Sequence, residues 1–187
     1  MNEIKNYGFK LNEIEDPQAY KLGAIELPKE ILVFDGQWDN WLPTDELQFT
    51  PSYDTYGCTI YGTENIQQTL EKQRGLTSAE YDERYNYNLV KIVPPGADPH
   101  DAAESFRNDG VVSGLFPMSA TLAEYATPRP MPTKYVSQGI AHPYEMRHQW
   151  LWSRTIDKET RTKLIKEYLK YSPLGVSVTA WSEKDGV

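Results

Sequence analysis

The strongest constraint on the fold is a run of three helical patterns between residues 58 and 110, with no regular strand separating them. In the first pattern, residues 58–73, Ile66 and Leu70 lie four residues apart, and Gly75 follows as a helix-ending signal. The chain has no regular strand–helix alternation of the kind that builds a doubly wound parallel sheet. Helices first, then a loop-rich stretch, a helix and a strand predict an α+β fold.

The second pattern begins at the capping-box sequence of residues 77–80. Tyr81, Tyr85 and Leu89 then repeat every four residues. This spacing predicts a helix with an aromatic stripe, and such a stripe is more typical of a protein core than of a cofactor site.

The third pattern has clear start and stop signals. Asp98 is a good N-cap, Pro99 suits the first helical position, and Gly110 marks the end. A later helix is predicted after Asp157, and alternating side chains over residues 175–181 predict a strand.

The length of 187 residues corresponds to one domain with an arm. Residues 1–50 are predicted to be an irregular N-terminal arm wrapped on a core, because turn residues interrupt scattered apolar residues there. Residues 51–187 are predicted to form the domain itself.

The charge balance restricts the partners of the chain. It has 19 Lys and Arg against 27 Asp and Glu, a net charge of −8, which disfavours nucleic acid and anionic membranes. No apolar stretch approaches the ~20 residues of a spanning helix, and no secretion signal is recognised. We therefore expect a protein that binds neither nucleic acid nor a membrane.

The single cysteine, Cys58, directly begins the first helical pattern. One cysteine excludes an intrachain disulfide framework. A helix start stabilises a thiolate through its positive end and its unpaired N–H groups, which can also hold an oxyanion. Cys58 is therefore a candidate nucleophile if a histidine base lies within reach, and otherwise a small buried residue.

The residues around Cys58 carry a resemblance to a known family. Residues 56–62, YGCTIYG, resemble the block around the nucleophile of papain-like cysteine peptidases, in which a glycine leads through the cysteine into a long central helix. Further similar segments follow in collinear order over about residues 25–181, and these are residues 27–32, 36–39, 96–102, 110–112, 115–118, 166–171 and 173–180. The chain is also similar to divergent or truncated papain-like proteins carried by bacteriophages. This resemblance implies a cytoplasmic or virion-associated protein with a peptide or protein substrate, or a protein assembly partner.

The resemblance implies a fold, an activity and a set of site residues. The fold would be a helical domain with a long central helix, plus the start of a β-barrel-like second domain. Cys58 would attack a peptide carbonyl and form an acyl-enzyme, without a metal or any other cofactor. The implied substrate-binding residues are Gly96 and Ala97, whose backbone would pair with an extended peptide, and the pocket residues Asp98, Pro99 and Thr179.

The chain also departs from the family pattern. Ser52 stands where the family has a helper glutamine, and Thr59 replaces the usual tryptophan. The family's histidine and asparagine would fall beyond Val187, so the expected peptidase is incomplete in this chain. One alternative is a non-catalytic papain-like structural or assembly module, for example of a phage particle. Another is an unrelated α+β binding protein in which Cys58 is a core residue.

Two further expectations concern the histidines and the arm. His100 is expected to be exposed in the first turn of its helix, and none of His100, His142 and His148 has the spacing of a metal site. The arm is expected either to wrap its own core or to lie across the cleft as a built-in inhibitor.

Overall fold

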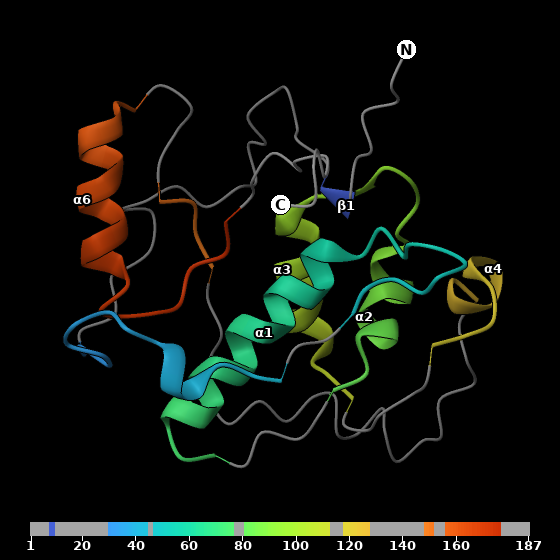
Figure 1. The fold of residues 1–187 in the computed structure, drawn as a ribbon, viewed down its shortest axis with the longest axis horizontal. Coiled ribbons are helices and arrows are strands. Elements are labelled where there is room, and N and C mark those ends of the chain that lie inside the picture. The colour runs from blue at the N-terminus through green and yellow to red at the C-terminus, as the bar shows by residue number, and fades with distance from the viewer. Residues whose placement is uncertain are drawn as a thin grey trace.

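The computed structural model describes residues 8–9, 30–44, 47–76, 81–112, 118–127, 148–151 and 156–176. In chain order its elements are β1 (Gly8–Phe9), η1 (Asp39–Trp41), α1 (Cys58–Gln73), α2 (Glu83–Val90), β2 (Gly96–Ala97), α3 (Pro99–Asp109), α4 (Leu122–Tyr125) and α6 (Lys158–Tyr168). The helix-rich character of the prediction is confirmed (Figure 1). The described residues form no barrel, and most of the strand predicted at 175–181 lies outside them.

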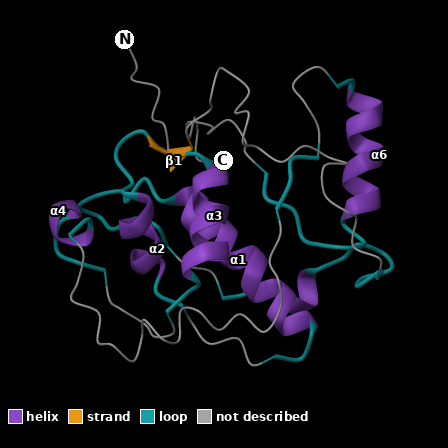
Figure 2. Ribbon diagram, turned by 180° about the vertical axis from the view of Figure 1, so that it is seen from behind, coloured by secondary structure: helices purple, strands orange, loops and turns teal. Residues whose placement is uncertain are grey.

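α1 is the longest described helix and lies in the middle of the molecule, between α6 on one side and α2 and α4 on the other (Figures 1 and 2). It packs against α2 and α3 and also contacts η1 and both strands. One apolar cluster joins these helices, and its buried members are Ile60, Tyr87, Ile92, Ala97, Ala102, Phe106, Val111 and Tyr125. None of the described helices is long and apolar enough to cross a membrane.

The bounds of α1 agree with the predicted helix over residues 58–73, but its buried face is largely polar. Ile66 is only half-buried, whereas Gln67 and Gln68 are almost fully enclosed. Gln67 donates a hydrogen bond to Glu71 at 3.0 Å, and Gln68 donates one to Glu64 at 3.1 Å. These pairs, four residues apart on one helix, give the enclosed amides partners that water would otherwise supply.

α2 begins later than the second sequence pattern predicts, because the helix starts at Glu83 after Asp82. The predicted stripe holds at Tyr81, which packs against the core, but fails at Leu89, which is 43 % exposed, whereas Asn86 and Tyr87 are buried. Asn86 donates to the carbonyl of Gly110 at 3.0 Å, so a tertiary hydrogen bond helps turn this face inward. The capping-box residues 77–80 lie outside the described part of the chain.

α3 confirms the predicted start and stop signals. The carboxylate of Asp98 accepts a hydrogen bond of 2.8 Å from the backbone N–H of His100, and Pro99 is the first helical residue. Gly110 follows the helix with φ +72°, a backbone conformation that glycine adopts without strain. Ala102 and Phe106, fully buried, anchor α3 in the core.

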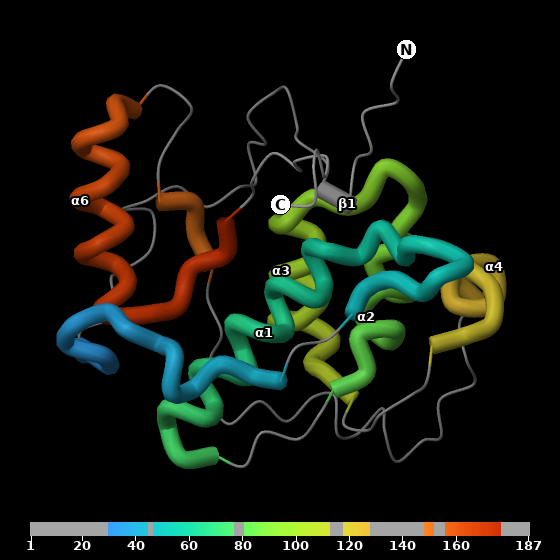
Figure 3. The backbone as a smooth tube through the Cα atoms, in the orientation of Figure 1, coloured from blue at the N-terminus to red at the C-terminus, as the bar shows by residue number. Residues whose placement is uncertain are grey.

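α6 is joined to the segment of residues 30–44, which is blue in Figure 3. The backbone N–H groups of Leu32 and Val33 donate to the carbonyl of Lys170 at 2.9 and 3.0 Å. The indole N–H of Trp38 donates to the carbonyl of Leu169 at 2.7 Å. The segment of residues 30–44 therefore covers the C-terminal end of α6. At the other end of the helix, Asp157 is the N-cap that the sequence predicts.

Candidate functional site

Cys58 is the first residue of α1, as the sequence predicts. The carbonyl of Gly57 accepts hydrogen bonds from the N–H groups of Ile60 and Tyr61, at 2.8 and 3.1 Å, and so starts the helix. The backbone N–H of Thr59 is directed at the Cys58 sulfur. The local geometry thus matches a thiol placed at the positive end of a helix.

The surroundings of the thiol nevertheless oppose its ionisation. Burial and, to a smaller extent, the nearby carboxylate of Asp54 raise the pKa of Cys58 from 9.0 to about 11, although the hydrogen bond from Thr59 lowers it. The net direction is opposite to the lowering expected from the helix start alone. At neutral pH the thiol is therefore protonated and is a poor nucleophile in this state.

A general base is not found beside the thiol among the described residues. The groups that influence Cys58 are Asp54 and the backbone of Thr59, and neither is an imidazole. The described histidines, His100 and His148, contact each other instead. The described residues therefore do not assemble the Cys–His pair that thiol catalysis requires.

Gly96 and Ala97, the backbone that the resemblance assigns to a peptide substrate, form β2 and are buried. β2 pairs in parallel with β1, with Gly8 opposite Gly96 and Phe9 opposite Ala97. The backbone edge proposed for a substrate is thus paired with an extended segment of the chain's own N-terminal region (Figure 1).

No described contact joins the remaining predicted pocket residues to Cys58. Asp98 caps α3, and Pro99 occupies its first position. Thr179 lies outside the described residues. On the described structure, Asp98 and Pro99 therefore have a clear structural role at the start of α3.

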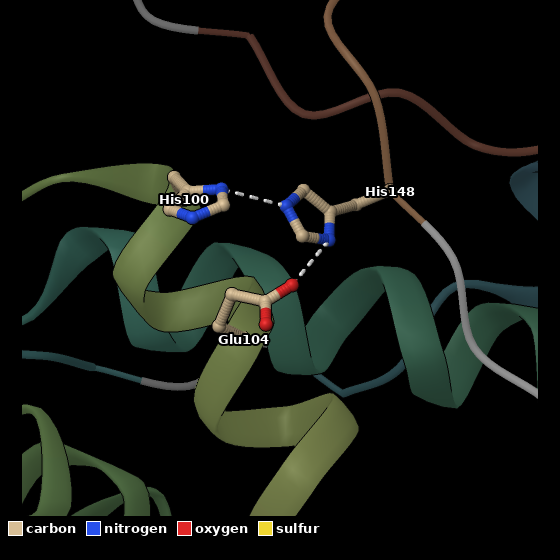
Figure 4. Close-up of side chains that lie close together, drawn as sticks. All are labelled: His100, Glu104 and His148. Atoms are coloured by element: carbon tan, nitrogen blue, oxygen red, sulfur yellow. Dashed lines mark hydrogen bonds and ion pairs between the residues drawn. The ribbon is translucent and has the colours of Figure 1, made fainter. Parts of the chain in front are cut away.

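A separate cluster forms at the start of α3, where the sequence predicts only a solvent-exposed histidine. That expectation is wrong, because His100 is buried, with 8 % of its surface exposed. Its Nδ1 lies 3.0 Å from Nε2 of His148, and Nδ1 of His148 lies 3.7 Å from Oε1 of Glu104 (Figure 4). Two side chains of α3 thus meet a histidine from a distant segment.

The charges of the cluster are set by its neighbours. Hydrogen bonds from Arg107 are the main reason that the pKa of Glu104 is lowered, and Asn108 adds another at 3.1 Å. Burial, followed by the proximity of His100, lowers the pKa of His148. An ionised carboxylate and a neutral imidazole are consequently favoured at neutral pH.

Sequence reasoning misses this cluster for a definable reason. His100 and Glu104 are four residues apart on a predicted helix, and this spacing is a readable signal that they share a face. His148 is 48 residues from His100, so only the tertiary structure brings its imidazole there.

No protein-family model matches the chain, and no curated protein or solved structure matches it either.

Proposed function

We propose that this chain is a papain-like module that acts in binding or assembly and does not cleave peptides by itself. Its fold would comprise the helical domain around α1 and the start of a β-barrel-like second domain. The observation that carries the proposal is the state of Cys58: its pKa is raised to about 11, and no described histidine is beside it. A thiol at the nucleophile's place, with no base beside it among the described residues, fits a module that has kept the family architecture for another use.

The pairing of β1 with β2 supports a binding role. Gly96 and Ala97 hold an extended backbone segment, Gly8–Phe9, by parallel strand pairing. Addition of a strand to a sheet edge is a common way to bind peptides, since the main chain supplies the hydrogen bonds. The partner class is therefore an extended protein segment, such as one from an assembly component of a phage particle.

A second candidate function is peptide-bond hydrolysis through a Cys58 acyl-enzyme. The specific observation in its favour is that Cys58 begins α1 with the N–H of Thr59 directed at its sulfur. This function requires a histidine base from elsewhere, such as another copy of the chain. It also requires the edge of β2 to be released from Gly8–Phe9.

Alkylation of the native protein with iodoacetamide at pH 7.5 tests the first proposal. We expect native Cys58 to react more slowly than the same thiol in urea, because the pKa of about 11 lies two units above 9.0. If the thiolate alone reacts, this difference approaches ~100-fold. Cys58→Ala is the control and must not be labelled.

Faster labelling of the native protein than of the unfolded chain would contradict the binding module and favour the peptidase. An assay with a fluorogenic peptide then separates the two functions. For the binding module, removal of residues 1–29 yields no hydrolysis that depends on Cys58. For the peptidase with an inhibitory arm, the same deletion switches on hydrolysis, and Cys58→Ala abolishes it.

A further inference from the structure

We propose that His100, Glu104 and His148 form a binding site for a divalent transition-metal ion of the zinc type. This site is distinct from Cys58 and does not depend on the proposed function. Its three side chains each offer one ligand atom, and those atoms all lie within 4.8 Å of one another. Figure 4 shows the three side chains turned toward one another at the start of α3.

The backbone explains why two of the ligands are preorganised. His100 and Glu104 lie four residues apart on α3, so both project from the same face of the helix. The cap by Asp98 holds the backbone of His100 in the first turn, and Phe106 anchors the helix in the core. The helix therefore holds both ligands on a rigid support before any ion binds.

The spacing of the two imidazoles suits a shared ion. Nδ1 of His100 and Nε2 of His148 are 3.0 Å apart. Two nitrogens that bind one zinc ion at ~2.1 Å with a tetrahedral angle are roughly 3.4 Å apart. A separation of the rings by a few tenths of an ångström would thus replace their mutual hydrogen bond with two metal bonds.

Burial and charge favour zinc over harder cations. The side chains of His148 and Glu104 are 23 % and 21 % exposed, so the site is sheltered but still open to a water ligand. The guanidinium of Arg107 compensates the carboxylate of Glu104 and leaves little net negative charge. Two imidazoles with one compensated carboxylate match Zn²⁺, whereas Mg²⁺ and Ca²⁺ require oxygen-rich sites.

A bound ion would tie residues 148–151 to α3. His148 is the ligand that comes from outside the helix, and it lies 48 residues from His100 in the sequence. With three protein ligands, one position of a tetrahedral ion is left for water. Glu104 can ligate directly or hold the Nδ1–H of His148, and both arrangements are known for carboxylates beside zinc-bound histidines.

Titration calorimetry of the full chain with Zn²⁺, after treatment with EDTA, tests the site. We expect one zinc ion per chain, no comparable binding of Mg²⁺, and a higher unfolding temperature with zinc. Removal of a residue that only supports a metal ligand typically weakens metal binding by ~10–100-fold. His148→Ala removes a ligand itself, so zinc binding should weaken by at least this factor. His142→Ala is the matched control, since it removes the chain's third histidine and leaves the cluster residues unchanged.

Two further variants keep the test independent of folding. Glu104→Gln should weaken binding while circular dichroism shows an unchanged helix content, because Glu104 is not part of the apolar core. Cys58→Ala should bind zinc like the wild type, which excludes the thiol as the ligand. Equal affinity of His148→Ala and the wild type would overturn the proposal, as would an equal loss in His142→Ala or the absence of zinc binding.

Discussion

The starts of α1 and α3 make an instructive comparison. Each helix places a chemically versatile side chain in its first turn, Cys58 in α1 and His100 in α3, and both helices contribute to the same core. The thiol is half-buried beside Asp54, with no described imidazole next to it. His100 instead meets a second imidazole and, through it, a carboxylate.

The difference shows that a helix start does not by itself determine chemistry. Both starts offer unpaired N–H groups and the positive end of the dipole. At α1 the desolvation of Cys58 outweighs this field and raises its pKa to about 11. At α3 the Asp98 carboxylate accepts a hydrogen bond from the N–H of His100. What the cluster at this helix start can bind is therefore decided by its side chains.

The largest effect is expected from a substitution in the apolar core to which both α1 and α3 contribute. Phe106→Ala empties a fully buried position between α3 and its neighbours and should lower the free energy of unfolding by ~3–5 kcal/mol. Urea unfolding measures the change. Phe34→Ala is the control, because Phe34 is 84 % exposed, and it should stay within ~0.5 kcal/mol of the wild type. Similar losses in both variants would mean that this core does not support the two starts.

The next effect concerns the charge beside the thiol at α1. Asp54→Asn removes the negative charge but keeps an oxygen that can accept the 2.7 Å hydrogen bond from the N–H of Tyr56. The pKa of Cys58 should fall from about 11 toward 9.0, and alkylation at pH 8 should accelerate. The gain should remain below the ~100-fold of a two-unit shift, because burial is the larger cause and persists.

The pH profile of the alkylation rate gives the sign of this effect. For the wild type the rate should rise tenfold per pH unit and level off only near pH 11, whereas Asp54→Asn should level off at lower pH. Glu30→Gln is the control for a general change in net charge. An unchanged profile in Asp54→Asn would show that Asp54 does not act on the thiol.

A moderate effect is expected at the start of α3. Asp98→Ala removes the side-chain acceptor of the His100 N–H group and should cost ~0.5–2 kcal/mol of stability. Asp98→Asn keeps an acceptor oxygen and should stay close to the wild type. Thermal unfolding of the three proteins measures the difference, and equal stability of the two variants would contradict the capping role.

The smallest effect is expected on α6, whose start carries no cluster of this kind among the described residues. The ion pair of Lys163 and Glu159 spans 2.8 Å, but the side chains are 74 % and 80 % exposed. A double-mutant cycle with Glu159→Gln and Lys163→Gln should give a coupling of only ~0.3–0.5 kcal/mol. A coupling well above ~1 kcal/mol would contradict this expectation and show that an exposed ion pair stabilises α6 strongly.

Sequence patterns predict the helices better than their surroundings. The bounds of α1 and the cap of α3 follow from residues within one or two helical turns, and these predictions are confirmed. The aromatic stripe fails at Leu89, because Asn86 on a neighbouring face finds its hydrogen-bond partner in Gly110, 24 residues away. The papain-like resemblance and its substrate residues remain predictions.

By itself, the sequence of this protein determined the bounds of α1, with Cys58 as its first residue, and the start and end of α3. Only the tertiary structure decided the protonation of that thiol, the pairing of β1 with β2 and the meeting of His100 with His148. The physical reason is one of range. Caps and helix spacing act over about four residues, whereas burial and ligand geometry depend on segments that meet only when the chain packs.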